Sequence, residues 1–374
     1  MPVRRLAIRR RFPVHRMTDA PRQPNVWVLL GRKIGDNEQC LALAEALGWP
    51  FAVKRLVFNP LYRIWNLLLG RSRASLDRRA SDPLEAPWPD LVIGVGRRSV
   101  PVARWIQGQS HGATRLVQIG RPRAPLDWFD LVLAAPQYGL PRRDNVLQLT
   151  LPVVRSKAED AAEIARWAAS TAGLPRPYVA LLVGGTGDPY TLDAGAAARL
   201  GAAASRLARA LGGSLLVSTS RRTAPAAAVA LERALDAPNR FHRWAEGVAD
   251  NPYRAFLALA DAVVVTADSA SMIADAAATG RPVRLFRLPR QPSLQYRTNR
   301  WLAARLGPLH RLLVSNGLLS GMRDLDLLHA RLLQDGIARW LAEAPESAAA
   351  LGMGGARTGE IDRVVARVRA ILRG

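Results

Sequence analysis

The sequence has one cysteine, few lysines and no long apolar run. Because Cys40 is the only cysteine, the chain can form no internal disulfide bond and no cysteine-ligated zinc site. The five histidines are scattered and no HExxH motif occurs, so no metal site is expected. No stretch approaches the roughly 18 apolar residues that a membrane-spanning helix needs. These features favour a reducing, cytoplasmic compartment and a protein without a transmembrane helix.

The positive charge comes almost entirely from arginine. The formal net charge is +23, and lysine occurs only at Lys33, Lys54 and Lys157. Together with the abundant alanine, this bias is typical of a GC-rich genome, which weakens the charge as evidence of function. It still favours anionic partners such as nucleotide phosphates or lipid surfaces. Nucleic acid is not expected, since the arginines are spread along the chain and not clustered with stacking aromatic residues.

Length and patterning predict two domains of the α/β class. The chain has 374 residues and 49% hydrophobic residues, enough for two cores. Short apolar runs alternate with helical patterns, which indicates two doubly wound Rossmann-like domains facing a cleft. The expected parts are a disordered basic tail or mis-assigned start (1–23, with Met17 as the alternative first residue), a first domain (24–152), a linker helix (153–177), a second domain (178–345) and a final helix crossing back to the first domain (346–374).

Residues 261–283 give the clearest local signal. They read as strand, polar loop, helix, turn and strand, with Ser269 or Ser271 as the helix N-cap. The exposed amide groups at such a helix start form a ready site for phosphate. Asp275 lies on the same helix, where its carboxylate could reach ribose hydroxyls. The alternative is an ordinary capped helix with a solvated aspartate.

Polar loops follow three predicted strands of the second domain, at 184–187, 218–223 and 266–271. In open α/β sheets, ligands bind beyond these carboxyl ends. Glycines would let a ligand approach the backbone, and Arg221 or Arg222 offers a guanidinium suited to diphosphate. The alternative is turn and capping chemistry. The candidate donor-binding residues are Gly184, Gly185, Thr186, Ser218, Ser220, Arg221, Arg222, Asp268, Ser269, Ser271, Met272 and Asp275.

The first domain offers a second group of candidates. Its first strand is followed by the loop 31–39, which would lie at the carboxyl edge of the sheet; Asp36 or Asn37 can alternatively cap the next helix. The candidate acceptor-binding residues are Gly35, Asn37, Gln39 and Arg97. The segment 58–73 mixes aromatic, aliphatic and basic residues, which predicts a helix lying on an anionic membrane or a helix packed on the sheet.

Two common nucleotide-binding motifs are absent. The sequence has no GxGxxG and no GxxxxGK[ST] motif, which argues against dehydrogenases and P-loop NTPases. Instead, GDNEQ (35–39), STSRRT (218–223), DNPY (250–253) and TADSASMIADAAATGRPV (266–283) together resemble the elongated-mitochondria family of mitochondrial fission proteins. The resemblance covers about residues 25–345, and the last motif is the most specific. The second domain is also similar to GT-B glycosyltransferases of the MurG type.

The resemblance implies a GT-B fold with the sugar donor in the second domain, the acceptor in the first, and no metal or cofactor. Asp275 stands where such enzymes place an acidic residue, usually glutamate, against the donor ribose. The implied activity is a bacterial glycosyltransferase that moves a sugar from a nucleoside-diphosphate sugar to an envelope saccharide or a lipid-linked acceptor. Its expected place is the cytoplasm or the cytoplasmic face of the inner membrane.

A mechanism and two alternatives follow. Arg221 or Arg222 and the helix start would stabilise the leaving diphosphate, and Asp36 would be the general base, with Asp188 and Glu38 as rivals. Arg97 would bind an anionic acceptor. A non-catalytic adaptor of the mitochondrial fission type would instead show a degraded donor site. A nucleotide-sugar 2-epimerase would need carboxylates from both domains, for which the second domain offers the weak pair of His242 and Glu246.

Overall fold

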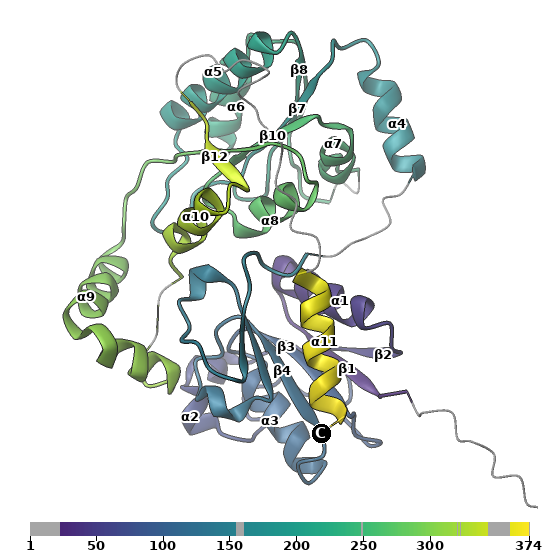
Figure 1. Ribbon diagram of the computed structural model, residues 1–374, viewed down its shortest axis with the longest axis vertical. Coiled ribbons are helices and arrows are strands. Elements are labelled where there is room, and N and C mark those ends of the chain that lie inside the picture. Colours follow the sequence, from purple (N-terminus) through teal and green to yellow (C-terminus); the bar gives the residue numbers. More distant parts are fainter. Residues whose placement is uncertain are drawn as a thin grey trace, which may run out of the picture.

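The computed structural model describes residues 23–154, 161–247, 250–319, 321, 323–342 and 360–373. The predicted tail lies outside the described residues except for Gln23, and so do parts of the predicted linker and of the segment before the last helix. The described chain forms two α/β bodies stacked one above the other, each built on a six-stranded parallel sheet (Figure 1). The predicted α/β fold of two Rossmann-like domains facing a cleft is confirmed.

The first domain has the strand order β2-β1-β3-β4-β5-β6. Its strands are short, apolar runs with little alternation, because helices cover both faces of a parallel sheet and bury both. Their bounds are β1 (Val26–Leu30), β2 (Phe51–Arg55), β3 (Leu91–Val95), β4 (Arg115–Ile119), β5 (Leu131–Ala134) and β6 (Val146–Gln148). The helices are α1 (Ile34–Leu47), α2 (Asn66–Leu69) and α3 (Val100–Gln109), with short 3-10 turns η1 (Pro60–Arg63), η2 (Leu126–Trp128) and η3 (Pro136–Tyr138).

The last helix of the chain, α11 (Glu360–Arg373), packs on the first domain beside α1 (Figure 1). Val364 and Val368 are buried in the core beneath it. The Glu360 carboxylate at its start accepts hydrogen bonds from the backbone amides of Thr150 (2.6 Å) and Leu151 (3.2 Å). The chain therefore passes from the first domain to the second and returns.

The second domain has the strand order β12-β11-β10-β7-β8-β9. The strands are β7 (Tyr178–Leu182), β8 (Ser214–Ser218), β9 (Asn239–His242), β10 (Ala262–Thr266), β11 (Val283–Phe286) and β12 (Ala338–Trp340). The helices are α4 (Ala161–Thr171), α5 (Ala194–Ala210), α6 (Pro225–Arg233), α7 (Tyr253–Leu259), α8 (Ala270–Ala278), α9 (Leu294–Ser315) and α10 (Leu325–Gln334). The two edge strands, β9 and β12, were not predicted as strands, because each is short and lacks a run of β-branched residues.

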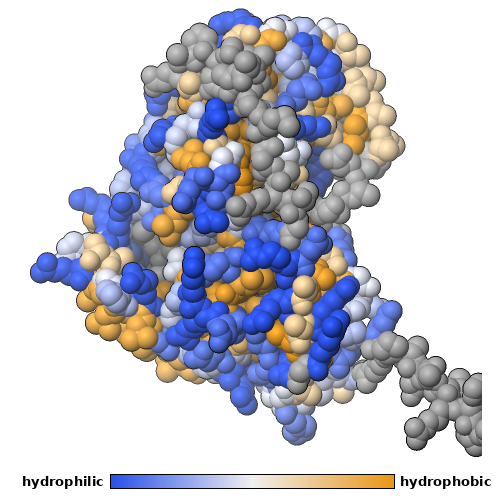
Figure 2. Space-filling view, in the orientation of Figure 1, coloured by the Kyte–Doolittle hydropathy of each residue, from blue (hydrophilic) through white to orange (hydrophobic). Residues whose placement is uncertain are grey.

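Two helices depart from simple expectation. The predicted linker helix, α4, packs against α7, where Trp167 meets Phe256 edge to face with ring centres 5.5 Å apart. α9 lies outside both domain bodies and is kinked at Gly307, whose φ is 48°, before Pro308 (Figure 1). It exposes Trp301 and other large apolar residues, and Figure 2 shows orange surface at its position. Among the described helices, none is long and apolar enough to cross a membrane.

The predicted single helix over 58–73 is wrong. The chain instead forms the 3-10 turn η1 and the four-residue helix α2, separated by extended backbone at Ile64 and Trp65. Pro60 starts the turn, and Gly70, with φ 54°, ends α2. The side chain of Asn59 accepts a hydrogen bond from the Leu61 amide, which fixes the turn locally.

Each sheet has a switch point, the place where strand order reverses and where open α/β sheets bind ligands. In the first sheet it lies between β1 and β3, and in the second between β7 and β10. The starts of α1 and α8 meet across the domain boundary: a Cβ on Gly35 would lie 3.9 Å from Ser271 Oγ. Arg254 and Glu38 approach to 4.0 Å across the same boundary. The carboxyl ends of the two sheets therefore face each other.

Candidate functional site

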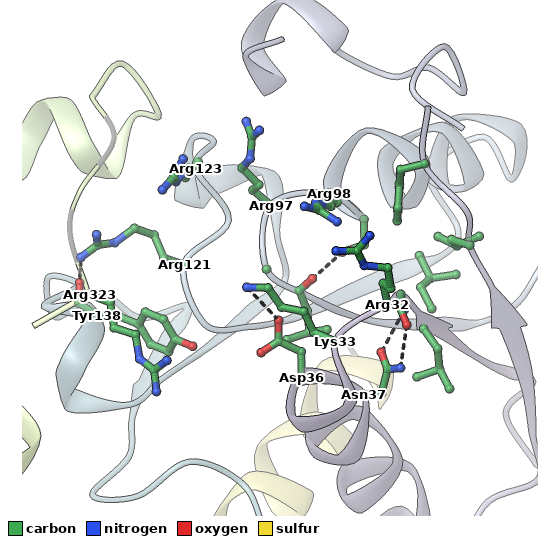
Figure 3. Close-up of a pocket in the computed structure, with 18 of the residues that line it drawn as sticks. Arg32, Lys33, Asp36, Asn37, Arg97, Arg98, Arg121, Arg123, Tyr138 and Arg323 are labelled. Atoms are coloured by element: carbon green, nitrogen blue, oxygen red, sulfur yellow. Dashed lines mark hydrogen bonds and ion pairs between the residues drawn. The ribbon is translucent and has the colours of Figure 1, made fainter. Parts of the chain in front are cut away.

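The first switch point holds a cavity of about 300 Å³ (Figure 3). The loops after β1, β3 and β4 line it, together with Tyr138 of η3 and residues 321 and 323 before α10. Its basic lining residues are Arg32, Lys33, Arg97, Arg98, Arg121, Arg123 and Arg323. Asp36 is the only carboxylate among the residues that line it. The cavity therefore concentrates positive charge at the end of a sheet.

This charge is poorly neutralised. Within the described ranges, Arg97, Arg98, Arg123 and Arg323 form no ion pair with a carboxylate. Burial, followed by the charge of Arg98, lowers the pKa of Arg97. Burial and the nearby Arg123 lower the pKa of Arg121 to about 10. Like charges held this close repel one another, so the electrostatic potential of the cavity favours anions.

Hydrogen bonds fix the arginine-bearing loops. The buried side chain of Asn66, in α2, donates to the carbonyl groups of Arg97 and Pro122, each at 2.9 Å. Gln118 donates to the Gly96 carbonyl at 2.7 Å. Arg123 has a φ of 51°, a left-handed conformation that is uncommon outside glycine. The loops are therefore held in place without a ligand.

Of the residues predicted in the β1–α1 loop, Asp36 faces the cavity, whereas the side chains of Asn37 and Gln39 bond to the backbone nearby. Asp36 lies in the first turn of α1, 3.8 Å from Lys33, and faces the cavity. Asn37 closes the loop on itself: its side chain accepts from the Gly31 amide (2.9 Å) and donates to the Gly31 carbonyl (2.7 Å). Gln39 donates to the Gly35 carbonyl at 3.3 Å. Because α1 begins at Ile34, the alternative of helix capping by Asp36 or Asn37 is wrong.

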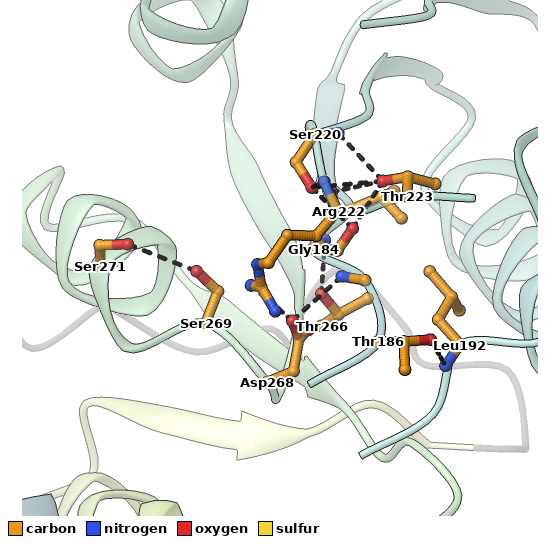
Figure 4. Close-up of polar contacts among 12 residues, drawn as sticks. Gly184, Thr186, Leu192, Ser220, Arg222, Thr223, Thr266, Asp268, Ser269 and Ser271 are labelled. Atoms are coloured by element: carbon orange, nitrogen blue, oxygen red, sulfur yellow. Dashed lines mark hydrogen bonds and ion pairs between the residues drawn. The ribbon is translucent and has the colours of Figure 1, made fainter. Parts of the chain in front are cut away.

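The second switch point is filled by the protein itself (Figure 4). The Asp268 side chain is 1% exposed, pairs with Arg222 at 2.6 Å and accepts a hydrogen bond from the Gly185 amide at 3.0 Å. A Cβ on Gly184 would lie 2.4 Å from an Asp268 oxygen, and one on Gly185 would lie 2.0 Å from the Arg222 carbonyl oxygen. The expectation that these glycines leave room for a ligand is wrong: Asp268 and Arg222 occupy that room.

The neighbouring hydroxyl groups also bind the chain. Ser220 and Thr223 donate to the Gly184 carbonyl at 2.7 and 2.5 Å (Figure 4). Thr186 accepts from the Leu192 amide at 3.2 Å. Ser218 is buried, and its hydroxyl has no partner in the part of the chain that is described. Hydrogen bonds within the turns therefore account for many of the predicted donor-binding residues. Arg221, in contrast, is exposed.

The start of α8 is open. Ser269 is its N-cap residue, but no side chain caps the helix; the Ser269 and Ser271 hydroxyls instead lie 3.4 Å apart. Ser271 is exposed towards α1 of the first domain, and Met272 is half-buried against the second core. Ser269 is thus the N-cap residue, as predicted, but no serine hydroxyl caps the helix and its amide groups remain available.

Asp275 lies at the domain boundary. The Tyr253 hydroxyl donates to it at 2.8 Å. Burial raises the pKa of Asp275, and the charge of Glu38 in the first domain raises it further, while Tyr253 and Arg254 lower it. Tyr253 ends the DNPY motif and Arg254 follows it. Their contacts with Asp275 were not predicted, because only the fold brings them close to α8.

The remaining candidates lie elsewhere. Asp188 accepts hydrogen bonds from the Ser293 amide (3.1 Å) and hydroxyl (2.6 Å) and so fixes the start of α9. The His242 ring packs against Trp167, with centroids 6.1 Å apart, and Glu246 is exposed. Neither His242 nor Glu246 lines the cationic cavity. Within the described residues, no group of three His, Cys, Asp or Glu side chains is placed to hold a metal.

Sequence reasoning missed most of the cationic cavity. Arg121, Arg123, Arg323 and Tyr138 were not predicted as site residues. A signal was present: Gly-Arg pairs follow three strands, in GRK (31–33), GRR (96–98) and GRPR (120–123). The ends of β1, β3 and β4 meet at one sheet edge, so these pairs converge.

The fold and site define an α/β protein of two Rossmann-like domains, with a cavity lined by basic side chains in its first domain. The family model described as mitochondrial fission ELM1 matches residues 34–350, and the chain belongs to that family.

Two relatives illustrate its range. The chain is 23% identical over 305 residues to the uncharacterized protein RP120 of Rickettsia prowazekii, covering 73% of this chain and 86% of that protein. It is 28% identical over 229 residues to the mitochondrial fission protein ELM1 of Arabidopsis thaliana, covering 54% of this chain and 53% of that protein. The match thus spans about half the length of the plant protein.

Solved structures with related folds include glycosyltransferases and UDP-sugar 2-epimerases. The UDP-GlcNAc 2-epimerase from Methanocaldococcus jannaschii is 12% identical and covers 94% of this chain and 100% of that chain, with a TM-score of 0.46.

Proposed function

We propose that this protein is a glycosyltransferase that uses a nucleoside-diphosphate sugar and a phosphate-bearing acceptor. One observation carries the proposal. The uncapped start of α8 in the second domain meets the start of α1, beside the cationic cavity, across the domain boundary. A transferase of this architecture needs such a meeting of a donor site and an acceptor site.

The donor would lie on the second domain. Its diphosphate would accept hydrogen bonds from the α8 amide groups and from Arg221, and a ribose hydroxyl would bind Asp275. As the bond from the anomeric carbon to the diphosphate breaks, the negative charge that develops there is stabilised by the same groups. No metal is required in this scheme, and the sugar nucleotide is the only co-substrate.

The acceptor would lie in the first domain. Asp36 faces the cavity and would take the proton from the acceptor hydroxyl while its oxygen forms the new bond to the anomeric carbon. Glu38 is the rival base, because it lies near Arg254 and Asp275 across the boundary. We place the acceptor among envelope saccharides or lipid-linked glycans at the cytoplasmic face of the membrane.

A non-catalytic adaptor is the second candidate. The family name and the named plant relative favour it. The filled second switch point also fits it, because Asp268 and Arg222 satisfy each other without a ligand.

A thermal-shift screen separates the two candidates. The purified protein is tested with UDP, GDP, CDP, ADP and dTDP, with and without Mg²⁺. A nucleotide at about 100 times its dissociation constant should stabilise the protein by roughly 2.7 kcal/mol. We expect one nucleotide to act without metal, and its effect to be lost in Asp275→Asn and Arg221→Ala but kept in Arg233→Ala, an exposed arginine on α6. Absence of any shift would favour the adaptor.

A further inference from the structure

An apolar surface adjoins the cationic cavity. The segment from β2 to α2 exposes large apolar side chains: Val57 (45%), Leu61 (46%), Ile64 (38%), Trp65 (59%) and Leu68 (78%). These residues lie within one short stretch of the chain. We call residues 57–68 the apolar segment. Exposed apolar surface of this kind marks a site for an apolar ligand or partner.

A second cavity, of about 480 Å³, connects the two features. Arg98, Phe58 and Arg32 line both cavities. The second cavity continues to Val57 and Tyr62 of the apolar segment. Its walls therefore combine cationic, aromatic and aliphatic side chains.

Side-chain contacts join the apolar segment to the loops that carry Arg97, Arg98 and Arg123. Asn66 lies within the apolar segment and donates to the carbonyls of Arg97 and Pro122. The guanidinium of Arg98 lies 4.1 Å from the ring centre of Tyr62. Charged and apolar binding surfaces are thus fixed relative to each other, which suits a ligand that has both a charged and an apolar part.

The charge of the first cavity fits more than one phosphate. Arg97 and Arg98, from the end of β3, and Arg123, from the end of β4, lie near one another in Figure 3, so their guanidinium groups can contact separate phosphate oxygens. The starts of α1 and α3 add partial positive charge at the same place. A neutral saccharide would leave this charge unsatisfied.

We propose that the first domain binds a long-chain lipid diphosphate, with the diphosphate in the cationic cavity and the chain running past Phe58 and Tyr62 onto the apolar segment. This inference rests on the proposed function, since it names the chemical class of the acceptor. The juxtaposition also assigns the apolar segment a role that its broken helical structure does not suggest.

Calorimetric titration tests the proposal with three probes. Farnesyl diphosphate, below its micelle-forming concentration, carries both parts; inorganic pyrophosphate carries only the head, and farnesol only the chain. We expect farnesyl diphosphate to bind about tenfold tighter, or more, than either part alone. Equal affinity for pyrophosphate and farnesyl diphosphate would overturn the proposal, because the apolar segment would then contribute nothing.

Matched substitutions locate the binding. Arg98→Gln should weaken pyrophosphate and farnesyl diphosphate alike, by about tenfold. Leu68→Ser, at an exposed position that should not affect folding, should weaken farnesyl diphosphate but leave pyrophosphate unchanged. Leu309→Ser, on the exposed surface of α9, and Arg233→Gln, on α6, are the controls. If the control substitutions weakened farnesyl diphosphate as much as Leu68→Ser and Arg98→Gln do, the binding would be non-specific and the proposal wrong.

Competition with UDP distinguishes the two sources of a diphosphate group. We expect UDP to leave farnesyl diphosphate bound, since the donor would lie on the second domain. Displacement by UDP that is lost in Arg98→Gln but kept in Asp275→Asn would mean that the cavity is the donor's own diphosphate site, which overturns the proposal. If farnesyl diphosphate binds as expected while no nucleotide does, the lipid site stands and the transferase proposal fails.

Discussion

The two domains have the same kind of parallel sheet, but their switch points differ. Each parallel sheet has a switch point where strand-end loops diverge. In the second domain, the Asp268 carboxylate and the Arg222 guanidinium fill that space and neutralise each other. In the first domain, the space is open and lined by basic side chains, with Asp36 as its only acid. Similar topology therefore does not make similar sites.

The difference separates residues that serve folding from residues that serve binding. A buried carboxylate is costly unless it is paired, so Asp268 and Arg222 depend on each other in the folded protein. Clustered arginines without carboxylate partners cost stability, and proteins tolerate such a cost chiefly where a ligand supplies the opposite charge. The polar residues of the second switch point thus maintain the structure, whereas Arg97, Arg98 and Arg123 of the first form no ion pair within the described part of the chain.

The largest effect should come from breaking the second switch point. Arg222→Ala leaves the Asp268 carboxylate, which is 1% exposed, without its cation, and we expect a loss of about 3 kcal/mol in the free energy of unfolding. The neighbouring Arg221→Ala, at an exposed side chain, should change it by less than about 0.5 kcal/mol. Urea denaturation monitored by circular dichroism measures both. Equal losses in the two variants would contradict the structural role of the pair.

An intermediate effect should come from the loops of the first switch point. Asn66→Ala removes two hydrogen bonds to buried carbonyls and should cost about 2 kcal/mol. It should also weaken pyrophosphate binding, because the loops that carry Arg97 and Arg123 lose their anchor.

Asn145 provides a matched control. Its side chain also donates to two carbonyls of the first domain, those of Leu126 (2.9 Å) and Phe129 (3.0 Å), away from the cavity. Asn145→Ala should lose comparable stability in urea denaturation and keep full pyrophosphate affinity. If both variants bound pyrophosphate equally well, Asn66 would be structural only.

The smallest expected effect is a gain in the free energy of unfolding. Arg123→Gln relieves repulsion from Arg97 and should stabilise the empty protein by about 0.5 kcal/mol at low salt, a magnitude reduced by solvent screening. The gain should shrink as salt is added, since the Debye length falls to about 8 Å at 0.15 M. Thermal unfolding in low and high salt measures it, with Arg233→Gln as the control. A loss of stability at low salt would show that the cavity is already neutralised.

Sequence patterns correctly predicted the secondary structure that depends on neighbouring residues. The stretch 261–283 folds as expected, because a β-branched run forms β10 and Gly280, with φ 70°, ends α8 before Pro282. The two-sheet fold is confirmed for the same reason, because the alternation of strands and helices can be recognised from short stretches of sequence. The family is confirmed by the match over residues 34–350.

The parts that sequence could not supply depend on contacts between distant residues. The sequence around Gly185 does not indicate that Arg222 lies against it in the fold. Gly185, which is needed for this close packing, was therefore interpreted as a ligand-binding glycine. Over 58–73 the helical composition was misleading, because Pro60 and the tie from Asn66 to two loops impose a different path. The donor residues, the base and the acceptor residues stay predictions.

The return of α11 to the first domain also bears on how the protein is made. Val364 and Val368 complete a core whose other members include strands at the opposite end of the chain. During synthesis, the first domain emerges long before these residues, and domains begin to fold as they emerge. The part of that sheet face beside α1, over β4 and β5, therefore stays uncovered until the second domain has been translated, and the last helix completes the first domain.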